Sequence, residues 1–441
     1  MTEYIQQLFP FSNCEKKKVV ADFKGGNISS DGGLLFIGEM DRRLNLVNRA
    51  AKLLPDNRDQ SKITHSQKTL LQQRVYALAQ GWEDLNDHDT LRDDPILQTA
   101  VGKTTALASA PTLCRMEHRA DRRAAIELNR LLIQTFIESF RDEPPTELIL
   151  DFDATDDPVH GNQIGKFFHG YYKSYCFLPL YVFCESQPLL AWLRPADIDG
   201  ARGAWLALKW IVSQLREAWP EVKITWRADS GFCRWRMLAW SEKNNIDYIV
   251  GIARNARLEG LAEHLTEKAA SEYENTDQKV RLFSWMHYGA KKWDHPRLVI
   301  AKAEHTSMGR NPRFIITTLK GDAQELYDDV YCPRGDMENR IKEQQLGLFA
   351  DRTSCHNWWP NQLRLLISTL AYVLVDSLRR EALPGTELES AQVTRIRLEL
   401  LKIGAVVVRN TRRIKIHLSS SWPRRKLFEH VHRRLMPRPS G

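Results

Sequence analysis

Cysteine is scarce in this chain, and its placement excludes two common roles. Only seven of the 441 residues are cysteines, and no pair of them shows the C-x-x-C spacing. They are Cys14, Cys114, Cys176, Cys184, Cys233, Cys332 and Cys355. An odd and scattered set predicts neither a disulfide framework nor a zinc ribbon, and it suits a reducing cytoplasm.

Long apolar runs and recognisable leader segments are also missing. The most apolar stretch, 363–378, carries Arg364 and Asp376 and falls short of a bilayer span, so we interpret it as a buried helix. Residues 1–13 are polar and aromatic, which predicts no signal peptide. The glycine-rich stretch 27–43 lacks G-x-x-x-x-G-K-[ST], so no nucleotide-phosphate loop is indicated. We therefore expect no membrane partner.

Positive charge, in contrast, is in mild excess. Sixty-three Lys and Arg face 55 Asp and Glu, which gives a net charge of +8 and favours a polyanionic partner such as nucleic acid. Segment 402–418 has the pattern of a hairpin that turns near Asn410. The tail 409–441 holds ten Lys or Arg and one acid, Glu429, which favours nucleic-acid contact, although a solvated surface has the same composition.

The first third of the chain has helical patterns. Segment 66–81 repeats apolar residues at helical spacing, and D-E-P-P-T-E at 142–147 has the composition of a linker. Segment 107–123 predicts an apolar turn and a basic helix that ends in Arg122 and Arg123. It is either the second half of a helix-turn-helix or two ordinary packed helices. The predicted division is a mainly helical domain at 1–145, a mixed α/β domain at 146–380 and a basic segment at 381–441.

Strand patterns begin directly after the linker. The predicted strands are 147–154, 171–185, 188–193, 223–229 and 247–253, with helices at 203–220 and 232–245. This order suits a ribonuclease H-like core and also other mixed α/β folds. Residues 254–320 predict a β-rich insertion in which cationic and aromatic side chains are mixed. Such a mixture is typical of a surface that contacts the DNA backbone, but a solvated strand face has the same composition. The residues in question are Lys291, Lys292, Trp293, Arg297, Arg310 and Arg313.

Aspartates stand at the ends of two predicted strands. Asp151 and Asp153 share one strand face because side chains alternate, and Asp153 is nearer the end. Asp229 ends another strand, where Ser230 and Gly231 open a turn. In a ribonuclease H-like order the two strands are neighbours, so their carboxylates can meet and hold Mg²⁺. A single such aspartate is equally well explained as a cap or turn former.

A third carboxylate follows the insertion. If the segment around it is helical, Arg334, Glu338 and Lys342 lie four residues apart on one stripe, with Gln345 close by. On spacing alone, an ordinary surface stripe of ion pairs is the better explanation.

These segments together resemble the DDE transposases of bacterial insertion sequences that carry a Y-R-E-K signature. The shared features are D-x-T at a strand end, D-S-G-F after a later strand, a β-rich insertion and Y-x-x-R-x-x-x-E. More narrowly, residues 27–380 resemble the family 1380 insertion-sequence transposases. The blocks that carry this resemblance are SDGGLLFIGEMDRR, QRVYALAQGWEDLNDHDTLRDDP, LASAPTLCRMEHR, DFDATDDPVHGNQ and RGDMENRIKE.

The resemblance implies a ribonuclease H-like catalytic core at 146–380 behind an N-terminal DNA-binding domain. It implies that Asp153, Asp229 and Glu338 hold two Mg²⁺ or Mn²⁺ ions, with Asp151 as the rival for the first position. It also implies that Tyr331 and Arg334 contact transposon-end DNA.

One position departs from the signature. Its lysine should fall seven residues after Glu338, where this chain has Gln345, so Lys342 is the candidate substitute for DNA contact.

The implied activity is metal-dependent cleavage of double-stranded DNA at terminal inverted repeats, followed by strand transfer into target DNA. The resemblance also implies a homodimer on DNA. Two alternatives stay open: a structure-selective nuclease on the same core, and an inactive DNA-binding regulator descended from a transposase.

Overall fold

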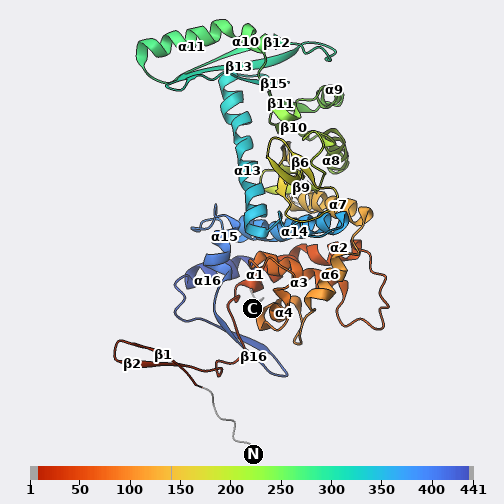
Figure 1. Ribbon diagram of the computed structural model, residues 1–441, viewed down its shortest axis with the longest axis vertical. Helices are drawn as coiled ribbons and strands as arrows, with labels where there is room; N and C mark the ends of the chain where they lie inside the picture. Colours follow the sequence, from red (N-terminus) through yellow and green to blue (C-terminus); the bar gives the residue numbers. More distant parts are fainter. Residues whose placement is uncertain (1–7, 141, 437–441) are drawn as a thin grey trace, which may run out of the picture.

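The computed structural model describes residues 8–140 and 142–436, so the ends of the predicted N-terminal domain and basic tail lie outside the described residues. The molecule is elongated (Figure 1), with the inserted segment at one end, the helices from both chain termini at the other, and a sheet between them.

The strands are β1 (Phe9–Cys14), β2 (Lys17–Ala21), β3 (Ile28–Ser29), β4 (Glu147–Ala154), β5 (Asp157–Pro158), β6 (Phe167–His169), β7 (Ser174–Phe177), β8 (Leu180–Cys184), β9 (Gln187–Trp192), β10 (Lys223–Ala228), β11 (Asp247–Ile252), β12 (Val280–Tyr288), β13 (Arg297–Thr306), β14 (Gly309–Arg310), β15 (Arg313–Thr317), β16 (Ala405–Arg409) and β17 (Ile414–Leu418).

The α-helices are α1 (Leu34–Leu44), α2 (Leu46–Leu53), α3 (Gln67–Ala79), α4 (His88–Leu91), α5 (Pro95–Val101), α6 (Ala110–Glu117), α7 (Arg122–Ser139), α8 (Ala204–Ala218), α9 (Trp235–Lys243), α10 (Ala256–Leu261), α11 (Glu263–Thr276), α12 (Ala323–Glu325), α13 (Gly335–Lys342), α14 (Trp358–Ala382), α15 (Val393–Ile396) and α16 (Arg425–Leu435). Tighter or wider turns are η1 (Ser230–Phe232), η2 (Leu326–Tyr331), η3 (Cys332–Arg334), η4 (Glu343–Gly347) and η5 (Arg397–Leu401).

A nine-stranded mixed sheet forms the centre of the protein. Its strand order is β12-β13-β15-β11-β10-β4-β8-β9, and β14 pairs with β13. Strands β4, β10 and β11 are parallel neighbours, whereas β8, β9, β13 and β15 join them antiparallel. The prediction that the two aspartate strands lie side by side is therefore confirmed.

The two faces of β4 have different neighbours because its side chains alternate. Leu148, Leu150 and Phe152 are buried in one core with the apolar faces of α8 and α9. The intervening residues, Asp151 and Asp153 among them, consequently point to the opposite face. Helix α14 packs on that side of the sheet, in a second core that includes residues of β8.

Helix α14 is the axis of this second core. It is 25 residues long, mostly buried, and contacts α1, α3, α7 and α16. The predicted segments 1–145 and 381–441 therefore share one hydrophobic core around α14. Throughout the described residues, no helix combines the length and the apolar character that a membrane crossing requires.

Two local predictions are wrong. Arg122 and Arg123 begin α7 rather than end the preceding helix, because Asp121 caps α7 by accepting a 2.8 Å hydrogen bond from the amide of Ala124. The inserted segment has the three expected strands but begins with two helices, α10 and α11, the second of which packs on β12 and β13.

Candidate active site

The three predicted carboxylates line one cavity of about 590 Å³. Asp153 lies near the end of β4, Asp229 directly follows β10, and Glu338 lies on α13. Lys342 lines the same cavity. Within residues 8–140 and 142–436, no three His, Cys, Asp or Glu side chains are already grouped tightly enough to share one metal ion. The carboxylates thus surround an open space rather than form a closed coordination shell.

Electrostatic interactions link these carboxylates. Burial raises the pKa of Asp153 to about 7; the charge of Arg334 opposes this shift, and the charges of Asp229 and Glu338 add to it. Like charges that repel one another in a cavity lined by oxygen donors are the donor set that a hard divalent cation requires. The residues present therefore fit a divalent metal ion.

Asp151 is held away from the cavity by a buried ion pair. It is only 2% exposed and accepts two hydrogen bonds from Arg227, its register partner on β10, one of them 2.9 Å long. Arg227 also donates to the backbone oxygen of Val330 at 2.6 Å, directly before Tyr331. The hydrogen bonds of Arg227 thus connect β4 and β10 to the segment that leads to Glu338. Asp153, and not Asp151, is the carboxylate of β4 that lines the cavity.

Asp229 has the turn-forming role that its sequence context also predicted. One carboxylate oxygen accepts a 2.8 Å hydrogen bond from the amide of Gly231 and caps the short turn η1. The same side chain lines the cavity, so Asp229 can cap the turn and also be a candidate metal ligand.

Glu338 pairs with Arg334 on the preceding helical turn, at 3.1 Å between Oε1 and Nη2. Burial lowers the pKa of Arg334, but the charges of Asp153, Tyr331 and Glu338 outweigh that effect and raise it. Arg334 is 18% exposed and Glu338 is 47% exposed. The i, i+4 ion pair that spacing favoured is therefore present, and Glu338 in addition lines the cavity with Asp153 and Asp229.

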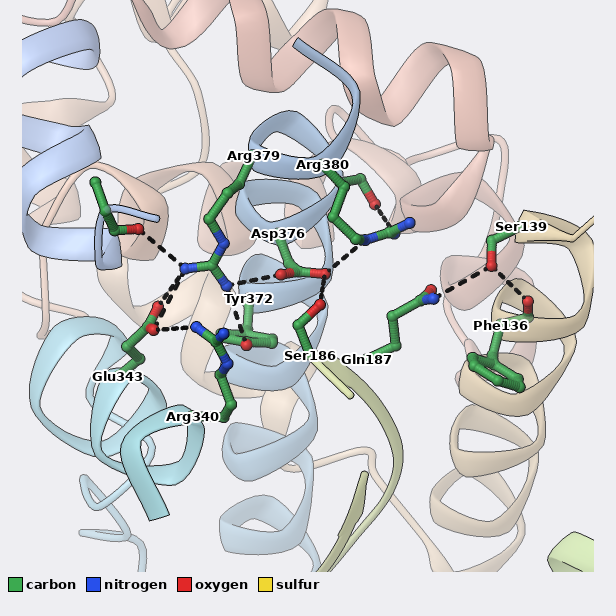
Figure 2. A network of polar contacts seen from close by, with 12 residues as sticks. Phe136, Ser139, Ser186, Gln187, Arg340, Glu343, Tyr372, Asp376, Arg379 and Arg380 are labelled. Carbon is green, nitrogen blue, oxygen red and sulfur yellow. Dashed lines mark hydrogen bonds and ion pairs between the residues drawn. The ribbon is translucent and has the colours of Figure 1, made fainter. Parts of the chain in front are cut away.

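A buried polar network anchors the helix that carries Glu338 (Figure 2). Glu343 accepts hydrogen bonds of 3.0 Å from both Arg340 and Arg379, and Arg379 also donates to Asp376 at 2.7 Å. These contacts fix the end of α13 on α14. Our sequence prediction missed this network; the signal was Asp376, an acid inside a long apolar helix.

Gln345 occupies the position where the signature has lysine. Its side-chain amide donates a 2.8 Å hydrogen bond to the backbone oxygen of Asp156, just beyond β4. Lys342 is exposed and makes no ion pair with any described residue. Three aromatic residues that sequence reasoning did not single out also line this cavity, namely His169 at the end of β6 and Tyr171 and Tyr172 just after it.

Comparison with known proteins gives the class of this chain. A family model described as "Transposase DDE domain group 1" matches residues 11–440, so the chain belongs to the DDE transposase family. Family membership implies nuclease and transesterase chemistry, and the family generally uses divalent metal ions. The predicted resemblance to DDE transposases is confirmed at this level.

No curated protein matches the chain. Among solved structures, the cryo-EM structure of a piggyBac transposase synaptic complex with hairpin DNA is similar, with 11% sequence identity and a TM-score of 0.42, over 90% of this chain and 82% of that chain.

Proposed function

We propose that this transposase cleaves double-stranded DNA at the ends of an insertion sequence and transfers the freed 3′ ends into target DNA. The observation that carries the proposal is the cavity in which Asp153, Asp229 and Glu338 meet from three separate segments. We assign these three residues as the metal ligands. The narrower membership, in the family 1380 transposases with a Y-R-E signature, remains part of the proposal.

The topology supports a ribonuclease H-like core. Strands β4, β8 and β9 form an antiparallel meander, and β10 and β11 follow as parallel strands on the other side of β4. This arrangement delivers the ends of β4 and β10 to one edge, where Asp153 and Asp229 lie.

Each residue then has a defined task. Bound Mg²⁺ or Mn²⁺, as two ions, supplies the Lewis acidity that activates an attacking oxygen and stabilises a leaving one. Asp153, Asp229 and Glu338 hold the ions, and Arg334 offsets their negative charge. Tyr331 and Lys342 contact the DNA beside the cavity.

The partner and the assembly belong to the same proposal. The net charge of +8 favours double-stranded DNA as the binding partner. The proposed domains are an N-terminal DNA-binding domain at 1–145, a catalytic domain at 146–380 and a basic segment at 381–441. We expect a homodimer on paired DNA ends and a cytoplasmic location.

Cleavage of element-end DNA by the purified protein in Mg²⁺ tests the proposal. Asp153→Asn and Glu338→Gln each remove a metal ligand and with it several kcal/mol of transition-state stabilisation. We therefore expect the rate of DNA cleavage to fall roughly 1000-fold in each variant. Asp336→Asn is the matched control, because Asp336 is an exposed acid on α13 outside the cavity.

The outcomes distinguish the alternatives. Activity that survives Asp153→Asn would contradict the metal assignment. Cleavage without joining in a strand-transfer assay supports the nuclease, and DNA binding that ignores a chelator, without any cleavage, supports the regulator.

A further inference from the structure

A second cavity, of about 410 Å³, opens on the other side of Asp229. It shares Asp229 and Ser230 with the carboxylate cavity, so the two spaces adjoin. Its walls come from the end of β11, the start of β15, the π-helical turn η2 and Arg334. This cavity is therefore built from β11, from the two ends of the inserted segment 254–320, and from the turn that follows it.

Its charge is opposite to that of the first cavity. Arg254, Arg313 and Arg334 line it together with a single acid, Asp229, and Arg334 also pairs with Glu338 of the first cavity. Arg254 and Arg313 are exposed, and neither side chain has an ion pair or hydrogen bond with any described residue. The net positive charge favours an anionic ligand.

Two other arginines of the same region are engaged by acidic side chains. Arg297, which the sequence offered as a DNA contact, is 4% exposed and bonded to Glu242 and Asp294. Arg281 pairs with Asp328. Arg254 and Arg313, in contrast, line the cavity beside the candidate active site without an acidic partner among the described residues.

The wall at Gly251 is closely packed against polar groups. The hydroxyl of Tyr331 lies 2.8 Å from the position that a Cβ atom on Gly251 would occupy, and the amide of Ser230 lies equally near. Only glycine leaves this wall open. A guanidinium group presents paired N–H donors that match the oxygens of a phosphate.

We propose that this second cavity binds a backbone phosphate of the DNA strand, next to the phosphate that is cleaved at the carboxylates, through Arg254 and Arg313. The inference rests on the proposed function, since it takes the DNA strand to pass from one cavity to the other across Asp229. It assigns Arg254, which the sequence had not singled out, and it gives Arg313 a definite role.

Substrates with one neutral phosphate test the proposal. Full-length protein is assayed for binding to element-end duplexes in Ca²⁺, each carrying a single methylphosphonate at a different position around the cleavage site. We expect one or two positions at which the neutral substitution weakens binding roughly tenfold. The double variant Arg254→Ala/Arg313→Ala should bind unmodified DNA roughly tenfold or more weakly and lose the methylphosphonate penalty at those positions.

Four further measurements keep this result specific. Arg254→Lys/Arg313→Lys retains the charges and should recover part of the affinity. In the double alanine variant, the slope of log affinity against log salt concentration should become shallower by about one for each phosphate that the protein no longer binds. Lys223→Ala removes a charge at the opposite end of β10 and should leave the penalty unchanged. Thermal unfolding confirms that every variant is folded.

The outcomes separate this inference from the proposed function. If the double variant binds as the wild type does, or retains the same methylphosphonate penalty, the inference is overturned while the transposase assignment stands. If the wild-type protein neither binds nor cleaves element-end DNA, the proposed function fails and the inference fails with it.

Discussion

Replacing Asp151 tests how the two aspartate strands are held together. Asp151 and Arg227 are opposite one another in register and buried, and Arg227 also donates to the backbone oxygen of Val330. Asp151→Ala leaves the guanidinium group buried beside one carbonyl oxygen. Loss of one partner from such a pair costs about 3–5 kcal/mol, so we expect the free energy of unfolding to fall by that amount.

A double variant separates stability from positioning. Asp151→Leu/Arg227→Met replaces the ion pair with apolar side chains of similar size, which should recover most of the stability. It still lacks the bond to Val330, which precedes Tyr331 in the chain. We therefore expect DNA cleavage to stay roughly 10- to 100-fold below the wild type, as for other residues that orient metal ligands.

Urea unfolding followed by tryptophan fluorescence measures the first effect, because Trp226 is buried next to Arg227. Cleavage over a Mg²⁺ titration measures the second. Asp153→Asn is the comparison, and we expect it to remain folded and lose cleavage. If Asp151→Ala keeps full stability, or if Asp151→Asn abolishes cleavage while Asp153→Asn does not, the assignment of the two aspartates is reversed.

Three further predictions follow from the packing. Glu343→Ala leaves Arg379 with Asp376 as its remaining carboxylate partner in the core, so urea unfolding should show a loss of about 1–3 kcal/mol and cleavage assays a weaker response to Mg²⁺; an unchanged Mg²⁺ response would separate this network from Glu338. Gly251→Ala forces a shift at Ser230, so cleavage should fall while circular dichroism stays native; full activity would contradict the tight wall. Burial raises the pKa of Asp157 well above 3.8, so the folded protein favours the protonated carboxyl group. The folded state therefore loses stability relative to the unfolded state as the pH rises and the carboxyl group ionises. Asp157→Asn should therefore raise the melting temperature more at pH 8 than at pH 4.5, and an equal change at both would refute this.

The sequence by itself determined the strands β4 and β10 and the places of Asp153 and Asp229 at their ends. Alternating side chains in β4 placed Asp153 on a definite face, and the apolar strand before Ser230 placed Asp229 at a strand end. These patterns are local, because each follows from the backbone geometry of a few consecutive residues. The side-by-side placement of β4 and β10 was expected from a ribonuclease H-like order of elements, and the structure adds that the two strands are parallel.

Tertiary structure alone decided which of several charged residues with similar sequence contexts are free to bind a ligand. Asp151 and Asp153 are equivalent by pattern, but Arg227 from another strand occupies only Asp151. Arg297 and Arg313 are both strand arginines of the insertion, yet only Arg297 meets acidic partners. The role of a charged side chain depends on partners far away in the chain, and local periodicity carries no information about those partners.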